Sequence, residues 1–149
     1  MTEKARWIRR EKSKRPVTVT GKSASSTDAG TWSTFTKAHD STVGVGLGFV
    51  LGDGIGCIDL DHCITDGVVA DWASSILDRC PPTFVEVSQS GEGLHIFGLL
   101  PEGPGRNIRR GDAAVEFYSV GRYIAMTGDR FGGAPSSLAD LSEVIASIS

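Results

Sequence analysis

The sequence lacks the features of a membrane or secreted protein. It has no run of about 18 consecutive apolar residues, the length that a membrane-spanning helix requires. Its first residues are charged, whereas a secretion signal needs an apolar stretch there. The chain has three cysteines, at positions 57, 63 and 80, and no Cys-x-x-Cys pair. We therefore expect a cytoplasmic protein without disulfides. A zinc site built on His62 and Cys63 is disfavoured, because a closed site needs four ligands at recognisable spacings.

Charge is distributed unevenly along the chain. The total is −3, but residues 1–22 carry eight basic and two acidic side chains, a net +6, so the remainder carries −9. A length of 149 residues fits one domain with a single core. We expect a single domain over residues 1–149 with a basic N-terminal arm at 1–22. Such an arm is suited to a polyanion, and a solvated tail is the alternative.

The apolar pattern predicts an α+β fold, a mostly antiparallel sheet backed by helices. A helical period predicts a helix at 32–39 that Asp28 or Thr31 caps, a second that starts near Val68 and ends before Pro81, and a third at 138–148. The turn at 52–54 predicts that the strand before it pairs with the strand after it. Strands are predicted at 6–10, 43–51, 55–61, 83–87, 94–100, 113–118 and 123–127.

Two aspartates interrupt the otherwise apolar strand at 55–61. A period of two places the carboxylates of Asp59 and Asp61 on one face, about 7 Å apart along the strand, and Ile58 and Leu60 on the other face. Neighbouring carboxylates repel each other and lose hydration when they are buried. We therefore expect this pair to hold a divalent cation, which indicates a metal-dependent enzyme.

A turn rich in glycine and serine precedes a histidine. Its sequence is Ser88-Gln89-Ser90-Gly91-Glu92-Gly93-Leu94-His95. The backbone N–H groups of Gly91 and Gly93 are able to converge on an anion, with the Ser90 hydroxyl beside them. His95 then enters a strand on the face opposite its apolar neighbours, where it is placed to donate to a phosphate oxygen. An ordinary hairpin turn with a surface histidine is the alternative.

A third acid lies within the apolar strand at 113–118. Burying a lone carboxylate costs several kcal/mol unless a cation, a basic group or water compensates. A metal shared with Asp59 and Asp61 would compensate Glu116, whereas an exposed edge strand is the alternative. Glu86 raises the same question, but the two polar residues that follow at 88–89 indicate a polar face there. Glu116 is therefore the preferred third ligand.

The order of these motifs resembles that of the archaeo-eukaryotic primase superfamily. An Asp-x-Asp strand is followed by a helix, by a Ser-Gly-x-Gly-x-His turn that enters a strand, and by an acid within a strand. More narrowly, the chain resembles the bifunctional primase/polymerase domain of phage and plasmid replication proteins. The resemblance covers most of the chain, from Trp7 to Gly128, and the blocks around Asp59, His95 and Glu116 carry most of its weight.

The resemblance implies a catalytic core on a sheet like that of the RNA-recognition motif. It implies a DNA polymerase/primase, a nucleotidyltransferase that adds nucleotides to a primer 3′-hydroxyl on a template and releases pyrophosphate. Two ions, Mg²⁺ or Mn²⁺, would be held by the catalytic residues Asp59, Asp61 and Glu116. The incoming nucleotide would be bound by Ser90, Gly91, Gly93, His95 and Arg122. DNA would be contacted by Lys14 and Arg15 of the arm and by Arg106, Arg109 and Arg110 of a basic loop, and the triphosphate is the alternative ligand of these residues.

The resemblance also implies partners and a larger context. The expected partners are a DNA template and primer, dNTPs or NTPs, a helicase domain or protein and a helical priming module, and no membrane. The sequence has no cysteine-rich zinc stem, no Gly-Lys-Thr/Ser ATPase loop and no C-terminal helical module. We therefore expect a catalytic domain excised from a longer replication protein, located in the host-cell cytoplasm if a phage encodes it.

Three other functions fit parts of the same pattern. A metal-dependent nuclease would also use acids and a histidine around a metal pair. A nucleotide-sugar transferase would use Asp-x-Asp on a divalent ion, but it would not require a basic arm. A non-catalytic domain that binds single-stranded nucleic acid would place aromatic residues on a basic sheet face. Acids on that face argue against the last function, because without metal they would repel phosphates.

Overall fold

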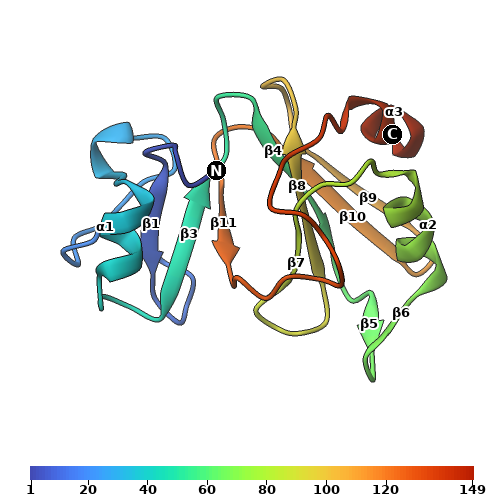
Figure 1. Cartoon of the computed structure of the whole chain (residues 1–149), viewed down its shortest axis with the longest axis horizontal. Helices are drawn as coiled ribbons and strands as arrows, with labels where there is room; N and C mark the ends of the chain where they lie inside the picture. Colours follow the sequence, from blue (N-terminus) through green and yellow to red (C-terminus); the bar gives the residue numbers. More distant parts are fainter. The chain divides into compact units, whose positions relative to one another are not determined.

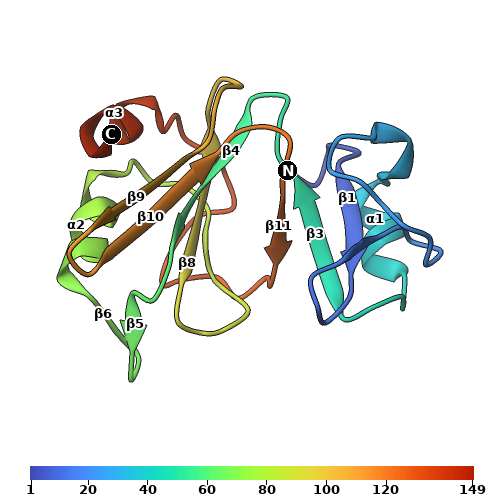
Figure 2. The same cartoon turned by 180° about the vertical axis from the view of Figure 1, so that it is seen from behind.

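The computed structural model describes residues 1–149 and divides them into two compact units (Figures 1 and 2). The first unit comprises Met1–Leu51 and Gly121–Thr127, and the second comprises Gly52–Val120 and Gly128–Ser149. Antiparallel strands dominate both, and the chain has three α-helices. The predicted α+β class is confirmed, whereas likeness to the RNA-recognition motif stays a prediction. None of the helices has the length and apolar character needed to cross a membrane.

The first unit is a four-stranded antiparallel sheet with one α-helix. The strand order is β11-β3-β1-β2. Trp7 is buried on β1, and its ring meets those of Phe35 and Phe49 edge-on, with centroids 4.9 and 5.1 Å apart. This aromatic cluster joins the helix to the sheet. The elements are β1 (Trp7–Arg10), β2 (Pro16–Val17), the 3₁₀ turn η1 (Ala29–Thr31), α1 (Phe35–Asp40), β3 (Gly46–Val50) and β11 (Tyr123–Met126).

Arginines of the predicted basic arm take part in the structure of the first unit. Arg9 and Arg10 are buried on β1. The guanidinium of Arg9 donates to the carbonyl oxygen of Val43, and that of Arg10 donates to the carbonyl oxygen of Leu47. Arg6 likewise donates to the carbonyl oxygen of Val50. These hydrogen bonds supply the partners that buried charged groups need, so much of the positive charge at 1–22 serves the fold.

The second unit is built on a five-stranded antiparallel sheet. Its strand order is β7-β8-β4-β10-β9, and a short hairpin, β5–β6, lies outside this sheet. The helices α2 and α3 lie beside the sheet (Figure 1). The elements are β4 (Ile55–Leu60), β5 (Ile64–Thr65), β6 (Val68–Val69), α2 (Asp71–Arg79), β7 (Val85–Val87), β8 (Leu94–Leu99), β9 (Arg106–Arg110), β10 (Ala113–Tyr118) and α3 (Ser142–Ile148).

The two faces of the five-stranded sheet have different characters. One face packs against α2 and α3 and forms the core of the second unit, to which the sheet contributes Ile58, Leu60, Leu94, Ile96, Ile108, Val115 and Phe117. Successive side chains of a strand point to opposite faces. Asp59, His95 and Glu116 therefore lie on the face opposite the helices. We call this the polar face.

Three predicted helices form, but each starts later than predicted. Helix α1 begins at Phe35 because Thr34, and not Asp28 or Thr31, accepts the N–H of Lys37. Asp28 instead caps η1 by accepting the N–H of Gly30. Val68 and Val69 form the strand β6, and α2 begins at Asp71. Helix α3 covers only the last part of the predicted segment at 138–148.

The predicted pairing of the strands on either side of the 52–54 turn is wrong. Gly52 and Ile55 exchange two backbone hydrogen bonds of 3.0 Å, so the turn itself forms. Beyond it, however, β3 pairs with β1 and β11, whereas β4 pairs with β8 and β10. Both edges of each strand are thus occupied by other partners, and the two strands belong to different sheets.

The predicted basic loop at 106–110 is the edge strand β9. It pairs with β10 over five residues, from Arg106 opposite Phe117 to Arg110 opposite Ala113. Only Ile108 is apolar and buried, and its neighbours are exposed. Charged side chains on an edge strand hinder its pairing with a strand of another chain. This role accounts for the three arginines of β9 and for its single buried apolar residue.

Candidate metal and nucleotide site

A row of polar residues crosses the whole five-stranded sheet. Glu86 of β7 lies opposite His95 of β8, and His95 lies opposite Asp59 of β4. Asp59 in turn lies opposite Glu116 of β10, and Glu116 lies opposite Asn107 of β9. Directly opposed residues on neighbouring strands share a face. Every strand therefore contributes one polar side chain to the same line on the polar face, which we call the polar row.

Three carboxylates gather at the centre of this face. Asp59, Asp61 and Glu116 each offer an oxygen, and these oxygens all lie within 4.8 Å of one another. All three residues are partly buried. Carboxylate oxygens in such a group are the donors that Mg²⁺ and Mn²⁺ prefer. The residues that the sequence predicted as metal ligands are thus brought together, and the donor set fits a divalent cation.

His95 lies beside this carboxylate cluster, and Glu86 holds the ring nitrogen that is directed away from the cluster. Its Nδ1 atom lies 2.9 Å from Oε2 of Glu86, and its Nε2 atom lies 4.0 Å from Oδ1 of Asp59. The first distance is a hydrogen bond and the second is too long for one. Glu86 is completely buried, and its Oε1 accepts the N–H of Gly128. Glu86 therefore lies on a polar face, as the sequence indicated, but it is buried there and holds His95.

The glycine-rich turn is closed by its own hydrogen bonds. The N–H of Gly91 donates to the carbonyl oxygen of Ser88, and the N–H of Gly93 donates to the hydroxyl of Ser88. The hydroxyl of Ser90 accepts the N–H of Glu92. The turn thus delivers the chain into β8 with His95 on the polar face. The assignment of Ser90, Gly91 and Gly93 to nucleotide binding stays a prediction.

The arginines of β9 project from opposite faces of the sheet. Ile108 belongs to the core on the helix side, so by alternation Arg106 and Arg110 share that side. Arg109 lies on the polar face, as does Asn107, whose side-chain amide donates to Glu116. Of the three arginines predicted to bind DNA, the structure places one on the face of the carboxylate cluster.

A small residue separates Arg109 from the cluster. Arg109 lies opposite Ala114 on β10, and the carbonyl oxygen of Ala114 accepts the N–H of Asp61 on the far side. Because alanine has no side chain beyond Cβ, a long arginine side chain is able to extend across it. Strand β10 is therefore the one strand that lies between Arg109 and Asp61.

The remaining predicted contacts belong to the first unit. The main-chain oxygen of Lys14 accepts a hydrogen bond from the Tyr123 hydroxyl, and Arg15 forms an ion pair of 3.0 Å with Glu11. Arg122 is exposed, and its main-chain oxygen accepts the N–H of Leu51. The carboxylate cluster belongs to the second unit. Roles for Lys14, Arg15 and Arg122 in binding DNA or nucleotide stay predictions.

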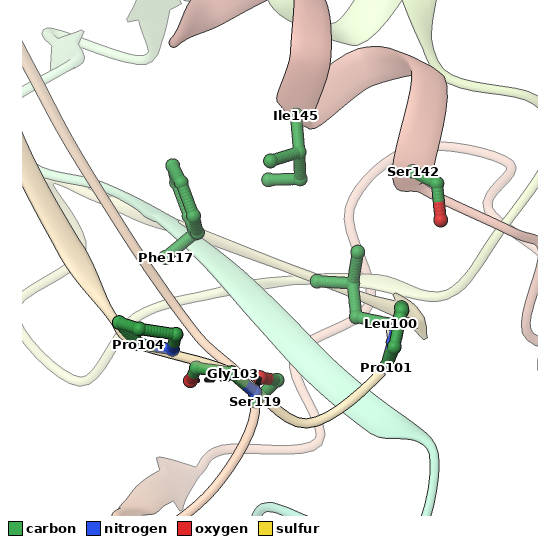
Figure 3. A pocket seen from close by; sticks show the side chains of 8 residues that line it. All are labelled: Leu100, Pro101, Gly103, Pro104, Phe117, Ser119, Ser142 and Ile145. Carbon is green, nitrogen blue, oxygen red and sulfur yellow. Dashed lines mark hydrogen bonds between the residues drawn. The ribbon is translucent and has the colours of Figure 1, made fainter.

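A pocket of about 210 Å³ lies on the face of the five-stranded sheet that packs against the helices. Figure 3 shows Phe117 and Ile145 projecting into it, with Leu100, Pro101 and Pro104 along its border. Phe117 belongs to the core face, whereas its neighbour Glu116 belongs to the polar face. The pocket is therefore separated from the carboxylate cluster by the sheet, and we assign it no part in the chemistry.

The structure also weighs against a thiolate zinc site. Cys63 is buried, and burial raises the pKa of its thiol to about 11. The neighbouring His62 is exposed and lies 3.6 Å from Glu92. The acids, histidines and cysteines that lie close enough together to hold a metal ion are Asp59, Asp61 and Glu116, and neither His62 nor Cys63 belongs to this group.

Comparisons with known proteins agree with this geometry. The family model described as "Bifunctional DNA primase/polymerase, N-terminal" matches residues 7–147. A curated relative, the "DNA Primase-polymerase" of Nitratiruptor phage NrS-1, is 38% identical over an alignment of 123 residues, and the match covers 76% of this chain. The match spans 17% of that relative's length. A family match over nearly the whole sequence shows that this chain belongs to the bifunctional DNA primase/polymerase family.

Proposed function

We propose that this chain is a nucleotidyltransferase that extends a primer 3′-hydroxyl on a DNA template and releases pyrophosphate. The observation that supports it most is the placement of Asp59, Asp61 and Glu116 within 4.8 Å of one another, with His95 alongside in the polar row. Family membership supports the same activity. The nuclease, the nucleotide-sugar transferase and the non-catalytic binding domain remain the alternatives that experiment must separate.

The three carboxylates would hold two Mg²⁺ or Mn²⁺ ions. Ions bound there would supply activation of the attacking hydroxyl and neutralisation of the departing pyrophosphate. The chain itself contributes the placement of the metal ligands. Asp59 and Glu116 face each other across β4 and β10, and Asn107 fixes Glu116 through a hydrogen bond of 3.1 Å. Ligands on neighbouring strands keep their geometry better than ligands on loops.

Nucleotide binding would depend on His95. We expect His95→Ala to weaken the binding of dTTP about tenfold, because a hydrogen bond to a charged phosphate is worth about 1.5 kcal/mol or more. Metal affinity should change less than twofold, because the carboxylates remain. Calorimetric titration of each ligand measures both values. His39→Ala, which removes an exposed histidine of the first unit, is the matched control. Equal loss of nucleotide and metal affinity would contradict this role.

Arg109 would contact the triphosphate from the edge of the polar face. We expect Arg109→Ala to raise the KM for dNTP about tenfold, since a guanidinium–phosphate contact is charge-assisted. Arg106→Ala and Arg110→Ala remove the same charge from the opposite face of the same strand and should raise KM less than threefold. Steady-state primer extension measures all three. Equal effects of the three substitutions would show that only the overall charge of β9 matters.

The proposed activity is tested by following a labelled primer on a DNA template. The purified chain is incubated with the four dNTPs and Mg²⁺ or Mn²⁺, and the products are separated by length. Metal-dependent lengthening is the expected result and separates the proposal from all three alternatives. Shortening of the primer without lengthening would identify a nuclease. Retained DNA binding with no change in length would identify a non-catalytic domain.

The wider context is proposed on the family resemblance alone. The relative is much longer than the matched segment, so its length leaves room for the helicase and priming modules that the resemblance implies. DNA template, primer and dNTPs or NTPs are the proposed partners. A cytoplasmic location stays a prediction.

A further inference from the structure

Glu86 is a buried acid that the proposed chemistry does not yet use. It lies on the edge strand β7 and has no exposed surface. An isolated buried carboxylate is costly and persists where it is hydrogen-bonded. Here one oxygen accepts the N–H of Gly128 at 3.0 Å, and the other lies 2.9 Å from Nδ1 of His95. The carboxyl group is thus fixed between the backbone and one imidazole ring.

The chemistry of the two groups determines which ring nitrogen carries a proton. An ionised carboxylate only accepts hydrogen bonds, so we assign a proton to Nδ1 of His95, which then donates to Glu86. The other nitrogen, Nε2, then points toward the carboxylate cluster, 4.0 Å from Asp59 Oδ1. That distance is too long for a hydrogen bond. Nε2 is therefore the ring atom that faces the proposed phosphate site. A phosphate oxygen is an acceptor, so the ring that binds nucleotide carries a proton on each nitrogen, with Nδ1–H donating to Glu86 and Nε2–H donating to the phosphate.

Packing fixes the ring in this orientation. His95 is itself nearly buried, with 7% of its surface exposed. Its ring meets that of Phe97, two residues further on the same face of β8, edge-on at 6.2 Å. Glu86 and His95 are also directly opposed on paired strands, so their side chains start close together. The ring of His95 is therefore held by the hydrogen bond to Glu86 and by the edge-on contact with Phe97.

We propose that Glu86 is a positioning residue that holds His95 through Nδ1 and aims Nε2 at the phosphates of the incoming nucleotide. The inference rests on the proposed function, because it assigns His95 to the nucleotide. A carboxylate that orients a histidine through its second nitrogen is a common arrangement around metal ligands and catalytic bases, and its removal typically costs about 10- to 100-fold in affinity or activity.

The first test uses the unaltered protein. Nitrogen-15 NMR of the histidine rings reports which nitrogen of His95 carries a proton, with His95→Gln identifying the signal. We expect a protonated Nδ1. A ring with a bare Nδ1 would overturn the inference, and this result does not depend on whether any Glu86 variant folds.

The second test substitutes the carboxylate. In Glu86→Gln an NH₂ group, which only donates, replaces one of the two carboxylate oxygens, so the contact with either Gly128 or His95 loses its acceptor. We expect dTTP affinity, measured with Mg²⁺ and no primer, to fall about tenfold, while metal affinity changes less than twofold. Glu143→Gln on α3, which removes an exposed carboxylate, is the control.

A double-substitution cycle shows whether Glu86 acts through His95. We expect Glu86→Gln to have no further effect on dTTP affinity in a His95→Ala background. An equal loss in both backgrounds would overturn the positioning role, because it would show a general structural effect. If His95→Ala alone leaves dTTP affinity unchanged, the proposed nucleotide contact of His95 fails, and the positioning role is overturned with it. Loss in His95→Ala without loss in Glu86→Gln overturns the positioning role alone.

Discussion

Asp59→Asn is expected to lower kcat/KM for primer extension about 10³-fold, equivalent to about 4 kcal/mol. Asp59 is the central carboxylate of the site, because it lies between His95 on β8 and Glu116 on β10. Asparagine keeps the shape of the side chain but removes the negative charge that a divalent ion requires. Steady-state extension of a primed template at saturating Mg²⁺ measures the loss.

The fold should persist in this variant. Replacing one of three neighbouring carboxylates relieves repulsion between like charges, so the unfolding temperature should stay the same or rise. Asp66→Asn is the matched control. Asp66 is exposed in the turn between β5 and β6 and adopts a φ of 52°, a conformation that asparagine tolerates well. Activity of Asp59→Asn within tenfold of the unaltered protein would mean that Asp59 is not a catalytic metal ligand.

Leu141→Ala is expected to lower the free energy of unfolding of the second unit by about 3 kcal/mol. Leu141 is fully buried at the start of α3 and joins the core face of the sheet. It packs directly over Gly98 of β8, where an added Cβ would lie 2.4 Å from Leu141 Cγ. Because the missing side chain of Gly98 provides the space for Leu141, shortening Leu141 leaves a void that the sheet is unable to fill.

Chemical denaturation, followed by far-UV circular dichroism, measures this change. Leu99→Ala is the matched control, because Leu99 is the neighbour of Gly98 and is 46% exposed. Its removal should cost less than about 1 kcal/mol, since little apolar surface is lost from the core. A similar cost for both variants would contradict the packing of α3 through Leu141.

The sequence was sufficient to predict most strands of the polar face and the acids on it. Apolar alternation is a local property, and it located β4, β8 and β10 within one or two residues. The same alternation placed Asp59 and Asp61 on one side of β4. Their convergence with Glu116 was predicted from the cost of burying a carboxylate, and the structure brings the three together.

Features that depend on pairing between distant segments were not predictable in this way. Strand β9 has one buried apolar residue, Ile108, and it is a strand because β10 supplies its hydrogen bonds. The partnership of Glu86 with His95 depends on the register of β7 against β8. The turn at 52–54 was predicted correctly. Whether β3 and β4 pair with each other, however, depended on the other strands that pair with each of them. Tertiary context decided each of these cases.

The central claim is that the carboxylate cluster catalyses nucleotidyl transfer. The most direct measurement supplies a primed template, Mg²⁺ or Mn²⁺ and one dNTP at a time, and quantifies both the extended primer and the released pyrophosphate. We predict one pyrophosphate for each nucleotide added, with the complementary dNTP strongly preferred, and neither product from Asp59→Asn/Asp61→Asn. Undiminished extension by that double variant, or shortening of the primer without pyrophosphate, would contradict the claim.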